Sequence, residues 1–144
     1  MTKTTTNLED LKTRLQSIAQ FAGKTVHVLS EDDFLTKLKG VPTEAVAILY
    51  EGSRSIDKAQ GSTHRAGISG EMTVSLLLVL DGKTMFGADL RGTALELLDL
   101  IRKQLLDTVA PSGHFWKFIA EAPAVEKDGK VVWVQRWSVP MSFI

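Results

Sequence analysis

The side chains that could perform chemistry are dispersed along this chain and do not form a catalytic pattern. The histidines His27, His64 and His114 have no second histidine or carboxylate three or four residues away on a clear helix face, whereas a closed metal site needs three or four converging ligands. The adjacent carboxylates Asp32 and Asp33 begin an expected helix, where capping explains them better than acid–base catalysis. The chain has no cysteine and no Gly-x-Ser-x-Gly elbow. The sequence therefore predicts no catalytic residue, no metal and no cofactor.

The segment 53–70 is the strongest local candidate for a binding function. It is rich in Gly, Ser and Thr and carries Arg54, Lys58 and Arg65 against Asp57 alone. A loop of this length inside a compact domain is usually functional or disordered. We expect a long, flexible, polar and basic loop that contacts an acidic partner surface, with a solvated connector as the alternative.

The bulk composition indicates one ordinary globular domain over residues 1–144. Lys+Arg and Asp+Glu are both 17, so the formal net charge is zero, and the basic loop has no aromatic residue. Sequence-specific binding to nucleic acid is therefore not expected. The N-terminus begins an amphipathic helix, and the longest apolar run, near 76–80, is too short to cross a bilayer. We expect no membrane contact and a cytoplasmic location.

Hydrophobic periodicity predicts an α+β fold with a mixed, mainly antiparallel sheet and amphipathic helices packed against it. Asn7 is the expected N-cap of the first helix. An i,i+4 ion pair is expected between Asp99 and Lys103. The expected elements, in the order α-β-α-β-β-α-β-β, are a helix over 8–22, a strand over 25–29, a short helix that opens at the capping box 30–33 and ends before Gly40, strands over 45–51 and 73–80, a helix over 90–107, and strands over 114–121 and 131–144.

The last expected strand is the most informative element. Its alternate residues Trp133, Trp137, Val139 and Met141 form one apolar row, in which Gln135 is the only polar member. A long apolar strand with an open edge is a template for another chain, so the pattern favours self-assembly. The helix over 90–107 offers a second apolar surface, because Leu95 and Leu106 widen its face beyond what one sheet covers.

Four segments together resemble the tail terminator, or tail completion, proteins of long-tailed bacteriophages of the Mu-like and lambda-like kinds. They are the helix Leu8–Ala22, the segment Ala47-Ile-Leu-Tyr-Glu-Gly52 that enters the polar loop, the helix over 90–107, and the strand Val132–Met141. The resemblance implies a structural, non-enzymatic subunit of a hexameric ring. The ring would cap the head-proximal end of the tail tube, stop its growth and join it to the head connector. The implied partners are further copies of the chain, the tail tube protein and the head–tail connector protein, in the virion tail and, during assembly, in the host cytoplasm.

Two groups of interface residues follow from this resemblance. The expected contacts with the tube or its lumen are Tyr50, Glu51, Arg54, Lys58, His64 and Arg65, and the expected subunit contacts are Leu95, Leu106, Arg136 and Trp137. One alternative is a small adaptor that grips an acidic protein with the basic loop 53–70. Another is an enzyme whose site is dispersed over strand ends, with His27 or His114 beside a carboxylate.

Overall fold

A computed structural model describes residues 3–29, 45–55, 69–81, 88–127 and 130–142, which form five strands of one sheet, two α-helices and a short 3-10 helix. The elements are α1 (Lys3–Gln16), the 3-10 helix η1 (Ala19–Phe21), β1 (His27–Leu29), β2 (Ala45–Ser55), β3 (Ser69–Asp81), α3 (Ala88–Leu106), β4 (Lys117–Lys127) and β5 (Lys130–Ser142). None of the helices in this part of the chain is long and apolar enough to cross a membrane.

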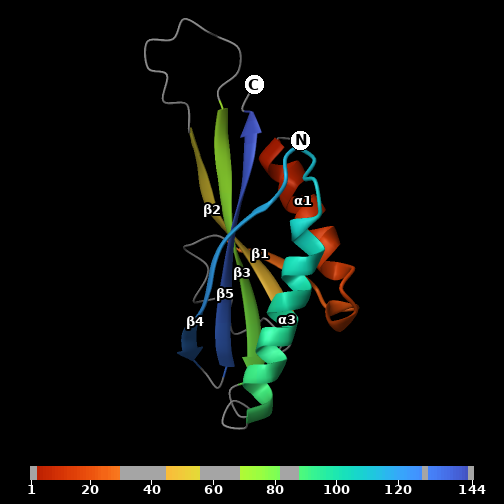
Figure 1. Cartoon of the computed structure of the whole chain (residues 1–144), viewed down its shortest axis with the longest axis vertical. Coiled ribbons are helices and arrows are strands. Elements are labelled where there is room, and N and C mark those ends of the chain that lie inside the picture. Colours follow the sequence, from red (N-terminus) through yellow and green to blue (C-terminus); the bar gives the residue numbers. More distant parts are fainter. Residues whose placement is uncertain (1–2, 30–44, 56–68, 82–87, 128–129, 143–144) are drawn as a thin grey trace, which may run out of the picture.

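The sheet has the strand order β1-β2-β3-β5-β4 (Figure 1). β1 is parallel to β2, and every other neighbouring pair is antiparallel. This confirms the predicted α+β class with a mixed, mainly antiparallel sheet. The longest pairing joins β3 to β5 without interruption from Ser69↔Ser142 to Asp81↔Lys130.

The position of β5 corrects the sequence argument for self-assembly. β5 pairs with β3 on one side and with β4 on the other, so the aromatic strand has no open edge. The edge strands of the described sheet are β1 and β4. Strand order depends on contacts between distant segments, which the alternation within one strand does not record.

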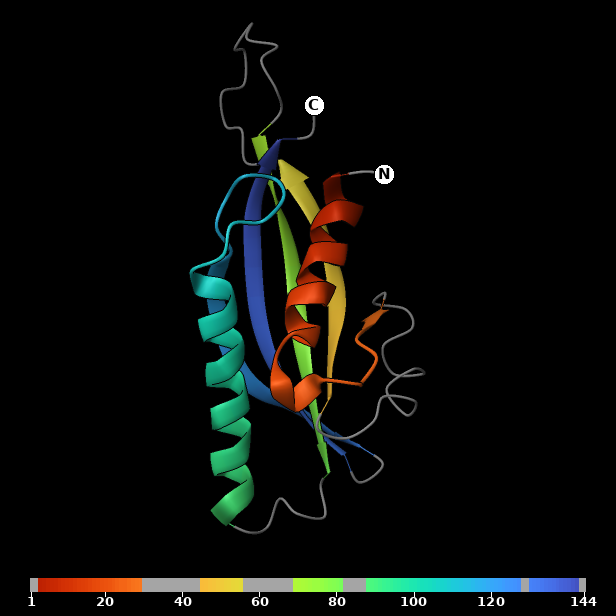
Figure 2. The same ribbon diagram turned by 90° about the vertical axis from the view of Figure 1, so that its right-hand side faces the viewer.

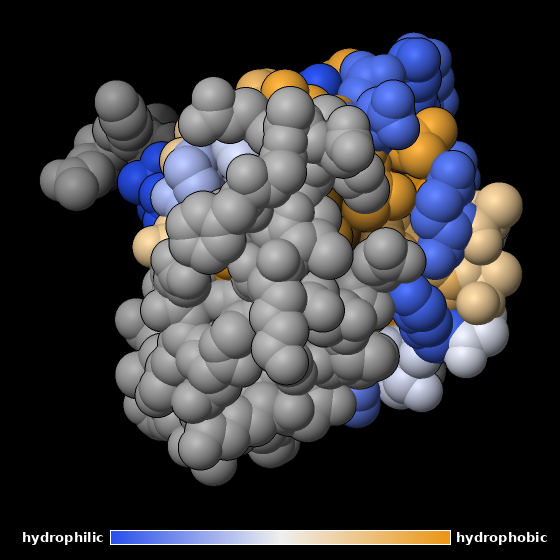
Figure 3. All heavy atoms as spheres, turned by 90° about the horizontal axis from the view of Figure 1, so that it is seen from below, coloured by the Kyte–Doolittle hydropathy of each residue, from blue (hydrophilic) through white to orange (hydrophobic). Residues whose placement is uncertain are grey.

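Both α-helices cover the same face of the sheet and run in opposite directions across it (Figure 2). The main core lies between them and the strands. It contains Leu11, Leu15 and Phe21 from the N-terminal region, and Ala94, Leu98, Ile101 and Leu105 from α3. The sheet contributes Val46, Ile48, Met72, Val74, Leu76, Leu78, Leu80, Trp137, Val139 and Met141. Seen from below, the side that carries the helices shows hydrophilic groups with hydrophobic ones exposed between them (Figure 3).

β3 is apolar without interruption from Leu76 to Leu80 because both of its faces are buried there. Leu76, Leu78 and Leu80 face the helices, whereas Leu77 and Val79 belong to a second cluster on the opposite face. The other buried members of that cluster are Leu29, Ala45, Ala47 and Val132. Further along the strands the same face carries the exposed residues Glu51 and Arg136, and we call that part of it the open face.

The predicted alternation of the last strand is confirmed from Trp133 to Met141. Trp137 is fully buried, Trp133 is partly buried against the same core, and Gln135 is buried between them. This corrects the expectation that Trp137 forms a subunit contact. A large aromatic in the middle of the helix-covered face stabilises the core and is not accessible to a neighbouring molecule.

The N-terminal helix begins earlier than predicted, and its expected cap is wrong. Asn7 lies inside α1 and is fully buried, and its Oδ1 accepts a hydrogen bond of 3.3 Å from the Ser112 backbone N–H. This tertiary contact outweighs the preference of asparagine for a cap. The α-helix ends at Gln16 rather than at 22, and η1 follows before Gly23 adopts a φ of 78°.

The remaining predicted elements agree with the structure to different extents. The helix over 90–107 is confirmed as α3, and the Asp99–Lys103 ion pair forms at 3.0 Å. The predicted loop is shorter than expected, because 53–55 belong to β2 and 69–70 belong to β3. Its other residues and the short helix predicted between Ser30 and Gly40 lie outside the described residues.

Candidate interaction surfaces

A β-bulge in β2 determines which side chains reach the open face. The register shifts between Tyr50, which pairs with Val74, and Gly52, which pairs with Thr73, so Glu51 is an extra residue. Gly52 has a φ of 119°, a backbone conformation that residues with a side chain rarely adopt. The extra residue reverses the alternation, and Arg54 consequently reaches the open face instead of the helix face.

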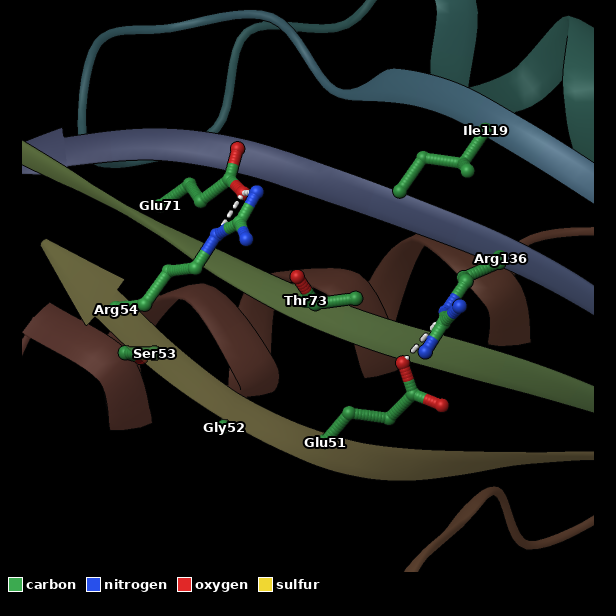
Figure 4. Close-up of a pocket in the computed structure, with 8 residues that line it drawn as sticks. All are labelled: Glu51, Gly52, Ser53, Arg54, Glu71, Thr73, Ile119 and Arg136. Carbon is green, nitrogen blue, oxygen red and sulfur yellow. Dashed lines mark hydrogen bonds and ion pairs between the residues drawn. The ribbon is translucent and has the colours of Figure 1, made fainter. Parts of the chain in front are cut away.

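Two ion pairs border a hollow of about 400 Å³ on this face (Figure 4). Arg136 Nε donates to Glu51 Oε2 at 2.8 Å, and Arg54 Nε donates to Glu71 Oε1 at 2.6 Å. Glu51 also accepts a bond of 2.9 Å from the Ser75 hydroxyl. The hollow is lined by Glu51, Gly52, Ser53, Arg54, Glu71, Thr73, Ile119 and Arg136.

The charges of the hollow are balanced in pairs. The hydrogen bond from Arg136 to Glu51 raises the pKa of the Arg136 guanidinium above its ordinary value. Arg54 is neutralised by Glu71 and does not add to a positive patch. Within the described ranges, no three His, Asp or Glu side chains are grouped so that they could hold a metal ion. The open face can offer polar contacts to a protein surface.

A buried polar network on the helix side joins α3 to the last two strands. The Gln135 side chain donates to the Leu98 carbonyl and to Glu121 Oε1, both at 3.1 Å, and its own oxygen accepts a bond of 2.7 Å from Trp137 Nε1. Glu121 also forms an ion pair with Arg102. That contact raises the pKa of Arg102, with a smaller contribution from Asp99. The lone glutamine in an apolar row was the sequence signal of this network, although its partners were not predictable.

Apolar side chains are exposed mainly where α3 turns into β4. Seven large hydrophobic residues are exposed in the described part of the chain, and five of them lie between 106 and 119. An isolated antiparallel bridge places Val109 beside Phe115. The rings of Phe118 and Trp137 pack in a T-shaped arrangement, with their centroids 5.4 Å apart. We call this region the α3–β4 corner; its members are Leu106, Val109, Phe115, Phe118 and Ile119, of which Phe118 packs on the helix-face Trp137 and Ile119 lines the hollow on the open face.

The structure brings together parts of the two predicted interface groups. Glu51 and Arg136, which were assigned to different interfaces, form one ion pair on the open face. Tyr50 is half-buried against the core, and its hydroxyl lies 2.7 Å from Ser53 Oγ. Leu95 and Leu106 are exposed on α3, at 45% and 48%. Lys58, His64 and Arg65 lie outside the described residues. Apart from Trp137, the interface roles stay predictions.

Four members of the corner were missed by sequence reasoning. Phe115, Phe118 and Ile119 lie in the segment that was predicted as a strand over 114–121, and Val109 lies shortly before it. Only the strand order shows that this strand is an edge, and an edge leaves these side chains without neighbours on one side.

Comparison with known proteins gives a likeness of fold. No protein-family model matches the sequence, and no curated protein matches it. Among solved structures, the chain is similar to one from a "Virion of native gene transfer agent (GTA) particle". The TM-score is 0.52 and the sequence identity is 12%, and the match covers 92% of this chain and 91% of the other. At this identity the likeness shows a common fold over nearly the whole length of both chains.

Proposed function

We propose that this protein is a structural component of a virion, and specifically a tail terminator of a phage-like particle. The observation that carries the proposal is the match to a chain of a gene transfer agent virion, which extends over nine-tenths of both chains. The sequence resemblance to tail terminators points to the same class of particle. In this role the protein acts by binding and requires no catalytic residue.

The exposed surfaces support an assembly role. Near-zero net charge provides little electrostatic repulsion between copies, and the α3–β4 corner offers apolar area at one edge of the sheet. In the proposal, copies of the chain form a hexameric ring on the tail tube, and the ring binds the head–tail connector. The paired charges of the open face, among them Glu51 and Arg54, are the polar contacts proposed for the tube or its lumen.

The first test is the mass of the protein in solution. Light scattering at micromolar concentration, with and without the tail tube protein of the same virus, is expected to show a ring of several copies in at least one condition. A strictly monomeric species in both conditions would count against the ring.

The second test separates a terminator from other virion components. Tube protein polymerised in vitro is imaged by electron microscopy with and without this chain. We expect shorter tubes that carry a ring at one end only. Unchanged tube lengths, together with labelling of the protein elsewhere on purified virions, would keep the virion role and reject the terminator role.

One basic residue of the adaptor hypothesis forms an ion pair within the molecule. Arg54, at the base of the basic loop, is paired with Glu71. The other two basic residues of this hypothesis, Lys58 and Arg65, lie outside the described residues, so the adaptor stays a prediction.

A further inference from the structure

The hollow on the open face lies between two β-bulges. The extra residue of β2 is Glu51. The register of β4 on β5 likewise shifts between Phe118 and Ala120, so Ile119 is an extra residue of β4. Both shifts fall at the level of Val74 on β3, and both extra residues line the hollow. Bulges redirect side chains and are frequent beside functional sites, so the two flanking strands together shape this part of the sheet.

The two ion pairs of the hollow have their carboxylates on the inside and their guanidiniums on the outside. The Arg136 side chain is 51% exposed, whereas that of Glu51 is 24% exposed. The corresponding values are 76% for Arg54 and 19% for Glu71. The hollow has no net charge, but a molecule that enters it meets mainly the guanidiniums.

The carboxylate of Glu51 is fully engaged, whereas the guanidinium of Arg136 has further donors. Glu51 accepts a hydrogen bond from Arg136 through Oε2 and one from the Ser75 hydroxyl through Oε1. A guanidinium carries five N–H donors in a planar fork, and the bond to Glu51 uses only Nε. The bond also holds the arginine in one orientation, so less side-chain entropy is lost when a ligand binds.

An acidic side chain of another protein fits this arrangement. A carboxylate pairs with the planar guanidinium through two parallel hydrogen bonds. Ile119 is exposed at the hollow and adds apolar contact, and arginine and apolar groups together are typical of protein interfaces. Nucleic acid is a poorer match, because neutralising phosphates requires a surplus of positive charge, which the two glutamates cancel here.

We infer that the hollow binds an aspartate or glutamate side chain of the tail tube protein, with Arg136 and Arg54 as the donors. The inference rests on the proposed terminator role and names the chemistry of its contact with the tube. Glu51 and Glu71 are positioning residues, because they hold the two guanidiniums. Glu51 therefore acts through Arg136 rather than by contacting the tube itself.

Co-sedimentation with short polymerised tubes of the tail tube protein measures the dissociation constant that tests the hollow. Arg136→Gln keeps a donor for Glu51 but removes the charge and the fork, and it is expected to raise this constant about tenfold or more. Arg54→Gln is a second variant at the more exposed arginine and should raise it about threefold or more. The matched control Lys103→Gln removes an exposed, ion-paired cation on α3 and should change it less than about twofold.

Glu51→Gln distinguishes ligand binding from a purely structural ion pair. The variant removes one negative charge from the hollow, and its amide oxygen can still accept a bond from Arg136. It is therefore expected to lower the dissociation constant roughly two- to fivefold, and this gain should shrink at high salt. A rise as large as that caused by Arg136→Gln would show a structural role and would overturn the inference. Circular dichroism checks that each variant folds.

The remaining outcomes separate the inference from the proposed function. Equal effects of Arg136→Gln and Lys103→Gln, while the wild-type protein binds the tubes, would reject the hollow and leave the terminator role intact. Short duplex DNA that displaces the tubes from the wild-type protein but not from Arg136→Gln would assign the hollow to nucleic acid and overturn the inference. A wild-type protein that does not bind the tubes would reject the proposed function, and the inference with it.

Discussion

Gln135 provides the sharpest test of the packing between α3 and the sheet. Its side chain is fully buried and makes three hydrogen bonds, to Leu98, Glu121 and Trp137. Gln135→Leu keeps a similar volume but removes the acceptor of the Trp137 Nε1–H. A buried donor left without a partner costs about 1–3 kcal/mol. Glu121 retains its ion pair with Arg102. We therefore expect the free energy of unfolding to fall by about 2 kcal/mol.

A second substitution at the same position adds a dependence on pH. Gln135→Glu places a carboxylate against Glu121 and removes the amide donor. An unpaired buried charge costs about 3 kcal/mol or more, so this variant should be less stable than Gln135→Leu near neutral pH. Protonation of the introduced carboxyl group relieves the repulsion. The deficit relative to wild type should accordingly shrink as the pH falls.

A double-mutant cycle isolates the contact with the indole. Urea unfolding followed by far-UV circular dichroism is measured for wild type, Gln135→Leu, Trp137→Phe and the double variant. Since phenylalanine has no N–H, Gln135→Leu should cost about 1–2 kcal/mol less in the Trp137→Phe background. A coupling below about 0.5 kcal/mol would refute the assignment of this hydrogen bond as a stabilising contact.

Three further predictions concern the surface. Gly52→Ala should lower the free energy of unfolding by about 1–3 kcal/mol in urea titrations, because alanine is strained at a φ of 119°. Glu51→Gln should change it by less than about 1 kcal/mol, and less at high salt, because Arg136 is half-exposed. The hydrogen bond from Lys103 lowers the pKa of Asp99 below 3.8, so its contribution is present above that pH and is lost as the pH falls below it. Asp99→Asn should thus be less stable than wild type at neutral pH but equal to it near pH 2, as measured by acid unfolding.

The local elements could be predicted from the sequence because their signals are local. The alternation around Trp137 and the buried stripe of α3 both follow from periodicity within one element. The predicted strand over 45–51 ends earlier than β2, which continues to Ser55. The bulge at Glu51 reverses the alternation, so the second half of β2 does not continue the pattern of the first. A prediction that assumes one uninterrupted alternation of side chains ends the strand where that alternation reverses.

The candidate surfaces could not be predicted from local patterns, because they depend on strand order and on contacts between residues far apart in the sequence. The exposure of Phe115 and Ile119 follows from the edge position of β4, and the burial of Asn7 follows from its contact with Ser112. The pairing of Glu51 with Arg136 joins residues 85 positions apart. Residue types identified some of the participants, such as Gln135, whereas only the strand order identified their neighbours.

The two ends of the sheet are unlike, and this has a consequence for the proposed ring. Copies related by rotation about one axis all point the same way along it, so the ring would have two unlike faces. With the strands along that axis, one face would present the ends of β2 and β5 with the start of α1, and the other would present the start of α3 (Figures 1 and 2). A component with such built-in polarity can hold one partner above and a different one below, without any further asymmetry in its parts.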